Sequence, residues 1–136
     1  MKNWIVTPED LKKGDLVPPT WYPCEIIKVE ESEASEDAKN PGSTNITFFF
    51  RIIDGEYKGV ELKRLFNETA WGFAKDFFAA MGFPKDAKGN YQISMNLFEQ
   101  AVGHKLMVYV KRDKSNKGNE YNNVADFKPM STNKAA

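Results

Sequence analysis

The sequence predicts a mainly β fold in which five short strands form one small barrel. Five segments are rich in alternating apolar or β-branched residues, and each is bounded by Gly, Pro or Asn. One helical segment separates the third strand from the fourth, and a shorter helix precedes the fourth strand. This order matches a five-stranded Greek-key barrel of the oligonucleotide-binding (OB) type, although an α+β sandwich could use the same order.

The length of 136 residues suits one domain with a single hydrophobic core. We expect that domain to span residues 1–130, with an acidic loop at 30–44 between strands one and two. Residues 131–136 are expected to form a disordered tail. Aromatic residues make up 13% of the chain, so we expect rings at the surface as well as in the core.

The first predicted strand covers residues 21–31. Tyr22, Cys24 and Ile26 alternate on one face, whereas Ile27 and Val29 continue on the other. One inserted residue would reconcile the two phases, as a β-bulge does. A long, bent first strand can then serve both halves of a small barrel.

The second predicted strand, residues 45–53, has the clearest alternation in the chain. One of its faces is uniformly apolar, and we expect it to point into the core. The other face mixes one large ring, Phe49, with one cation, Arg51. After a turn at Asp54-Gly55, residues 60–66 form the third strand.

The helix between strands three and four is predicted over residues 70–81, with Glu68 or Thr69 at its start and Gly82 at its end. Apolar residues occupy two of its stripes, one containing Phe73 and Phe77. A homodimer through this helix would cover the second stripe, although the second short helix could cover it as well. A short helix at 95–102 follows. Residues 105–113 and 121–127 form the last two strands.

Several function classes are not expected. No apolar run is long enough for a membrane span, and the N-terminus has no apolar signal-peptide core. Cys24 is the only cysteine, which suits a reducing cytoplasm. His104 is the only histidine, so any Ser/His/Asp or Cys/His arrangement rests on one residue beside a glycine at a strand start, where a surface turn histidine is the expected interpretation. With one Cys and one His, no zinc site can be assembled from the usual ligands. We therefore expect no enzyme, metal or cofactor.

Binding of single-stranded nucleic acid needs cations for the phosphates and flat rings on which bases stack. Phe49 and Arg51 share one strand face, and Tyr109 and Lys111 repeat the pair on another strand. Alternatively, Phe49 packs under the helix or an oligomer partner, and Tyr121 points into the barrel. The expected contact residues are Phe49, Arg51, Lys58, Lys63, Arg64, Tyr109, Lys111, Arg112, Lys117 and Tyr121.

The formal net charge is zero, but the charges are segregated along the chain. Residues 30–37 hold five acids and no base, which leaves 19 basic against 14 acidic residues elsewhere. This acidic segment is either a solvated loop or a cover that lies over the basic cleft when DNA is absent. Because the cations are few, we expect a shallow dependence of DNA affinity on salt.

Three stretches carry a family resemblance: LVPPTWYPCEIIKVEE, FFFRIIDGEYKGVELKRLFN with the helix ending AMGFP, and AVGHKLMVYVKRDKSNKGNEYNNVADFKP. Over residues 14–129 the chain resembles small phage proteins, long catalogued as of unknown function, that are regarded as OB-fold single-stranded DNA-binding proteins. The Gly-Glu-Tyr-Lys-Gly of residues 55–59 is the sharpest motif. Phe49 departs from the family pattern, which has a polar residue there. The tail carries Lys134 and no acid, unlike the acidic tails of bacterial single-stranded DNA-binding proteins.

The resemblance implies a non-enzymatic protein of phage replication and recombination, located in the cytoplasm of the infected host. Its expected partners are single-stranded DNA, RNA as an alternative ligand, and replication or recombination proteins. The competing hypothesis is a protein-interaction or structural module that uses the barrel without binding nucleic acid.

Overall fold

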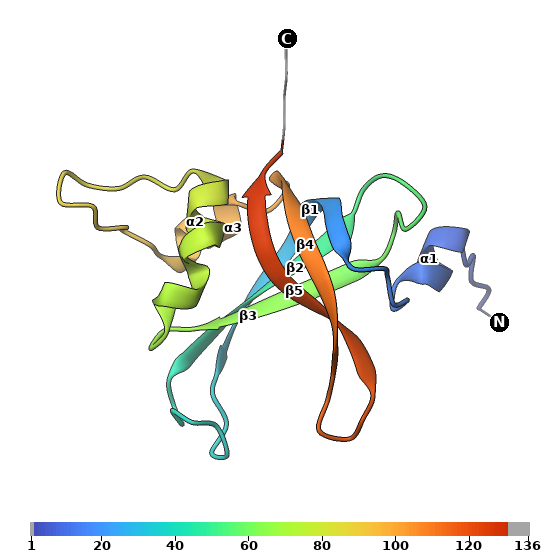
Figure 1. Cartoon of the computed structure of the whole chain (residues 1–136), viewed down its shortest axis with the longest axis horizontal. Coiled ribbons are helices and arrows are strands. Elements are labelled where there is room, and N and C mark those ends of the chain that lie inside the picture. The colour runs from blue at the N-terminus through green and yellow to red at the C-terminus, as the bar shows by residue number, and fades with distance from the viewer. Residues whose placement is uncertain (1, 131–136) are drawn as a thin grey trace, which may run out of the picture.

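The computed structural model describes residues 2–130 and shows a mainly β protein with few helices. The strands are β1 (Thr20–Glu33), β2 (Thr44–Ile52), β3 (Glu61–Asn67), β4 (Lys105–Lys114) and β5 (Glu120–Pro129). They form one antiparallel sheet in the order β3-β2-β1-β4-β5 (Figure 1). The sheet is not closed, because its edge strands β3 and β5 form no ladder with each other within residues 2–130.

Strand β1 bends at a bulge and joins the two halves of the sheet. Residues 20–25 of β1 pair with β4, and residues 24–33 pair with β2. The register with β2 shifts between Ile26 and Lys28, so the bulge predicted from the slipping apolar phase is confirmed. Tyr22, Cys24 and Ile26 are buried by plain alternation, and the bulge after Ile26 shifts the phase so that Val29 also packs against the core.

The core is dominated by phenylalanine rings from the sheet and one helix. The predicted inner face of β2 is buried along its length, including Phe48 and Phe50. Phe77 of helix α2 (Lys75–Met81) packs against this face, with its ring centroid 4.6 Å from that of Phe48 and 4.9 Å from that of Phe127 on β5. The helix therefore covers the core between the two edge strands.

The helix predicted over 70–81 is two pieces, a 3₁₀ turn η1 (Trp71–Ala74) followed by α2. It does not begin at Glu68 or Thr69, because the Glu68 carboxylate accepts a hydrogen bond from the Thr44 amide and Thr69 bonds to the Asn67 side chain. Phe77 is buried as expected of an apolar stripe, but Phe73 is 75% exposed. The left-handed φ of 68° at Gly82 confirms the predicted stop.

Two short helices flank the sheet at opposite sides of Figure 1. Helix α1 (Pro8–Lys12) is closed by reciprocal bonds between Thr7 and Asp10. Helix α3 (Met95–Gln100) is shorter than the predicted 95–102, and the Ser94 hydroxyl caps it by accepting from the Leu97 amide at 3.2 Å. No helix within residues 2–130 is long and apolar enough to cross a bilayer. The predicted tail 131–136 lies outside the described residues.

Candidate nucleic-acid interface

The outer face of β2 places Phe49 between two lysines on the neighbouring strands. Lys28 of β1 and Lys63 of β3 are its cross-strand partners. The Lys28 Nζ lies 4.9 Å from the centroid of the Phe49 ring, which is half-buried. Because α2 packs on the opposite face of β2, against Phe48 and Phe50, the alternative that Phe49 packs under the helix is wrong.

Two adjoining hollows lie between this outer face and β5, and we call them together the β3–β5 groove. They share Lys63, Tyr121 and Asn122, and the larger has a volume of about 500 Å³. Tyr121 is 45% exposed in the groove, so the alternative that it points into the core is wrong. The groove is lined by Lys13, Gly14, Thr47, Phe49, Glu61, Leu62, Lys63, Arg64, Leu65, Tyr121, Asn122 and Asn123.

Arg64 lines the groove but also holds its two walls together. Its Nη1 donates a hydrogen bond of 2.9 Å to the Val124 carbonyl of β5, across the gap that no ladder bridges. Partial burial lowers the pKa of Arg64 below its usual value. The planar guanidinium has five N–H donors, so donors remain for a phosphate while one holds β5.

Arg51 lies beside the groove in a small network of exposed charges. Its Nη2 is 3.0 Å from the Glu61 carboxylate, which is also 3.6 Å from the Lys13 Nζ. Exposed ion pairs of this kind are worth little, in general about 0–1 kcal/mol. A phosphate could therefore displace Glu61 from Arg51 at small cost.

Tyr109 is separated from the groove by its position on β4 and belongs to a second aromatic patch. Its ring packs edge-on against Trp21 of β1, with centroids 5.4 Å apart, and the Lys128 Nζ lies 4.3 Å from the Trp21 centroid. Sequence reasoning missed Trp21 and Lys128. The strand alternation could have found Trp21, because it precedes the inward Tyr22 and so faces outward with Tyr109.

A family model described as "Protein of unknown function (DUF669)" matches residues 9–136 of the chain. The chain belongs to this family. The matched stretch of this DUF669 protein includes all five strands and every residue of the β3–β5 groove. No curated protein matches the chain.

The remaining predicted cations of this DUF669 protein lie around the groove without lining it. Lys58 lies in the turn between β2 and β3, and Lys117 lies in the loop between β4 and β5. Lys111 is exposed on β4 opposite Asn123. Arg112 uses its Nε to donate to the Val17 carbonyl at 3.2 Å. The structure therefore gathers Phe49, Lys63, Arg64 and Tyr121, and leaves the others peripheral.

The acidic segment of residues 30–37 does not cover the groove in this structure. None of the described residues that line the groove belongs to it. The β1–β2 loop and the β4–β5 loop project from the same end of the sheet, on either side of it (Figure 1). The interpretation of the segment as an exposed loop therefore agrees better with the structure than that of a cover.

Proposed function

We propose that this protein binds single-stranded DNA with little sequence preference through the β3–β5 groove. One observation carries the proposal: two aromatic rings, Phe49 and Tyr121, line the same hollow as Lys63. Rings offer stacking surfaces to any base, and the cation offers a contact to the phosphate between bases. The second patch of Trp21, Tyr109 and Lys128 would extend the same chemistry along the outer face.

The proposal includes the fold, a five-stranded barrel of the OB type that is open between β3 and β5. The strand order and the helix between β3 and β4 support it, since both are those of the Greek-key barrel. The groove then lies where such barrels bind oligonucleotides, along strands two and three. The loops β1–β2 and β4–β5, which flank the ligand cleft of such barrels, project from one end of the sheet (Figure 1).

The resemblance to phage single-stranded DNA-binding proteins suggests the process in which the proposed function would serve. The protein would coat strands that are exposed during replication or recombination and keep them unpaired. Stacking on rings and contacts to phosphates need no cofactor. RNA offers the same bases and phosphates, so it belongs in the test as a competing ligand.

The test is a titration of labelled oligo-dT, about 20 nucleotides long, with the protein at low salt, followed by fluorescence anisotropy. Phe49→Ala and Tyr121→Ala should each weaken binding by roughly 5- to 150-fold, since stacking contributes about 1–3 kcal/mol per base. Phe73→Ala is the matched control, because Phe73 is 75% exposed and lies on η1, away from the groove. An oligo-U of equal length measures the preference for DNA.

Two results would overturn the proposal. One is the absence of any binding by the unaltered protein at low salt. The other is unchanged affinity in both the Phe49 and Tyr121 variants. Loss of binding in Phe73→Ala alone would move the DNA site to η1, whereas the absence of any binding by the unaltered protein would favour the competing hypothesis of an interaction module.

A further inference from the structure

The N-terminal arm, residues 2–6, presents apolar side chains that nothing in the described chain covers. Trp4, Ile5 and Val6 are 78%, 92% and 60% exposed, and none belongs to the core within residues 2–130. Three consecutive exposed apolar residues are unusual unless they serve a function. The arm leads into α1, whose Lys12 Nζ donates to the Glu56 carbonyl at 2.8 Å.

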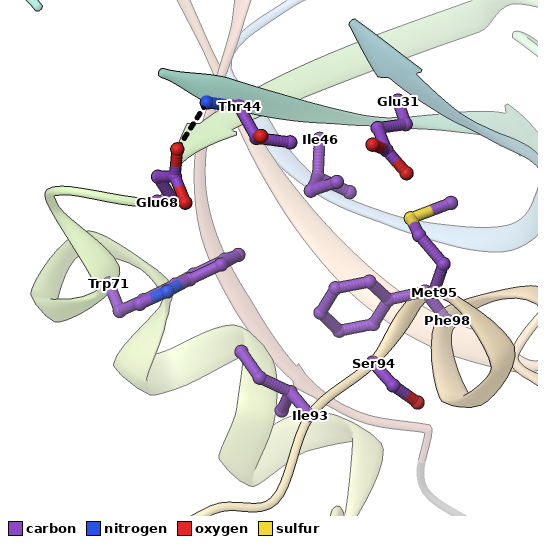
Figure 2. A pocket seen from close by; sticks show the side chains of 9 residues that line it. All are labelled: Glu31, Thr44, Ile46, Glu68, Trp71, Ile93, Ser94, Met95 and Phe98. Carbon is purple, nitrogen blue, oxygen red and sulfur yellow. Dashed lines mark hydrogen bonds between the residues drawn. The ribbon is translucent and has the colours of Figure 1, made fainter.

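A hollow on the opposite side of the molecule has the complementary character (Figure 2). Its floor is apolar, and two carboxylates stand at its rim, Glu31 from β1 and Glu68 after β3. Glu68 accepts from the Thr44 amide at 2.6 Å, whereas the Glu31 carboxylate has no hydrogen bond or ion pair within residues 2–130. The hollow is lined by Glu31, Thr44, Ile46, Glu68, Trp71, Ile93, Ser94, Met95 and Phe98.

The size and charge of this hollow define what could occupy it. Its volume of about 260 Å³ is below the ~300–1,000 Å³ of sites for small molecules, so one or two side chains suit it better. The carboxylates of Glu31 and Glu68 would repel a nucleic-acid phosphate. They would attract a basic segment, and the floor of the hollow is apolar. The complementary occupant is therefore a peptide with apolar side chains beside a cation.

The arm has this composition, since Lys2 is the one charged residue among residues 2–6 and stands two positions before Trp4. The arm and the hollow lie at opposite sides of the molecule, with α1 on one side and η1 and α3 on the other (Figure 1). An arm cannot reach the hollow of its own chain. We propose that the arm of one copy docks in the Glu31–Glu68 hollow of a second copy, with Trp4 or Ile5 on the apolar floor and Lys2 at the carboxylates.

This contact joins two different surfaces, so each docked copy still offers a free arm or a free hollow. Unless two copies exchange arms reciprocally, head-to-tail contacts of this kind form rings or open filaments, depending on the rotation between the copies. If the proposed function holds, neighbouring copies on one DNA strand would assist each other's binding, because the strand raises their local concentration. The contact itself does not require DNA.

Self-association without DNA is the first test, measured by sedimentation velocity over a range of protein concentrations. Trp4→Ser combined with Ile5→Ser should weaken it at least about tenfold, because whichever of the two apolar side chains docks is lost. Leu11→Ser is the matched control: Leu11 is 72% exposed but lies in α1, outside the arm, and association should not change. Association of the double variant equal to that of the unaltered protein would overturn the proposal.

The second test fixes the site of contact. Chains carrying Asn3→Cys are mixed with chains carrying Ile93→Cys under mild oxidation, and the mixed disulfide should form faster than either homodimer. The native Cys24 does not interfere, since it is fully buried. Lys2→Glu should weaken association, and Glu31→Lys in the same chain should restore it. Absence of the mixed disulfide, or no effect of either charge substitution on self-association, would overturn the proposed docking. Because neither test contains DNA, failure to bind oligo-dT leaves this inference standing.

Discussion

At the scale of single residues, the position of Phe49 carries most of the functional argument. Its neighbours Phe48 and Phe50 are fully buried, and the alternation of a strand turns Phe49 to the outer face. There it meets the Lys28 ammonium at 4.9 Å and the groove that contains Tyr121. A ring held beside a cation on a wetted face is poised to stack on a base without rearrangement of the core.

Cys24 illustrates the opposite case, a reactive residue type made inert by burial. It is 0% exposed, and desolvation raises the pKa of its thiol to about 12. At about pH 8, roughly one thiol in 10⁴ is ionised, and the thiolate is the nucleophile. We therefore expect no reaction of the folded protein with a thiol reagent, followed by absorbance, and full reaction in urea. Fast modification of the folded chain would contradict this.

The same burial predicts how stability depends on pH. The folded chain keeps the thiol proton to about pH 12, whereas the unfolded chain loses it near about pH 8.5. Above that value the unfolded state binds fewer protons than the folded state. The free energy of unfolding should therefore decrease as pH rises through this range, and Cys24→Ala should remove that part of the decrease.

At the scale of elements, the sheet is defined by how its two edge strands meet. β3 and β5 approach each other without a ladder, and the Arg64 side chain supplies the hydrogen bond between them. The groove lies along this unpaired stretch, lined by Lys63 and Arg64 from β3 and by Tyr121 and Asn122 from β5.

Arg64→Met should therefore destabilise the fold, because it keeps an apolar side chain but leaves the Val124 carbonyl without its charged donor. Hydrogen bonds to charged groups contribute about 1.5–3 kcal/mol, and we expect a loss in that range in urea unfolding. Lys63→Met is the matched control on the adjacent, exposed position of β3, with an expected change within about 0.5 kcal/mol. Equal losses of unfolding free energy in the two variants would show that the Arg64 hydrogen bond does not stabilise the fold.

Sequence patterns located most elements, with predictable errors at their ends. The slipping phase of β1 predicted its bulge, and Gly82 predicted the end of α2. The start of that helix was predicted wrongly, because the Glu68 carboxylate accepts from the Thr44 amide and the Thr69 amide donates to the Asn67 side chain. Those partners are distant in sequence or depend on the turn, so no helical periodicity reveals them.

At the scale of the whole molecule, a net charge of zero coexists with a groove whose lining includes Lys13, Lys63 and Arg64. The acids of residues 30–37 lie outside that groove. The groove therefore carries a local excess of positive charge without the long-range field of a basic protein. Binding should depend on direct contacts more than on general electrostatic steering.

The salt dependence of oligo-dT binding measures how many direct phosphate contacts the protein makes. With three to five phosphates neutralised, a plot of log affinity against log salt should have a slope of about −2 to −3.5, since each contact on a single strand contributes about −0.7. Lys63→Met should make the slope shallower by about 0.7, while Lys39→Met, on the exposed acidic loop, should leave it unchanged. A slope near −10 would point to a binding surface far larger than the groove.

The sequence by itself determined the strands, the bulge and the outward position of Phe49, because each depends on alternation between near neighbours. Only the tertiary structure decided which residues share the groove. Phe49 and Tyr121 lie on β2 and β5, which are not adjacent in the sheet, and they meet because the curved sheet brings its edges together. Their proximity depends on long-range packing and on the hydrogen bond from Arg64 of β3 to the Val124 carbonyl of β5. Local sequence patterns do not encode either.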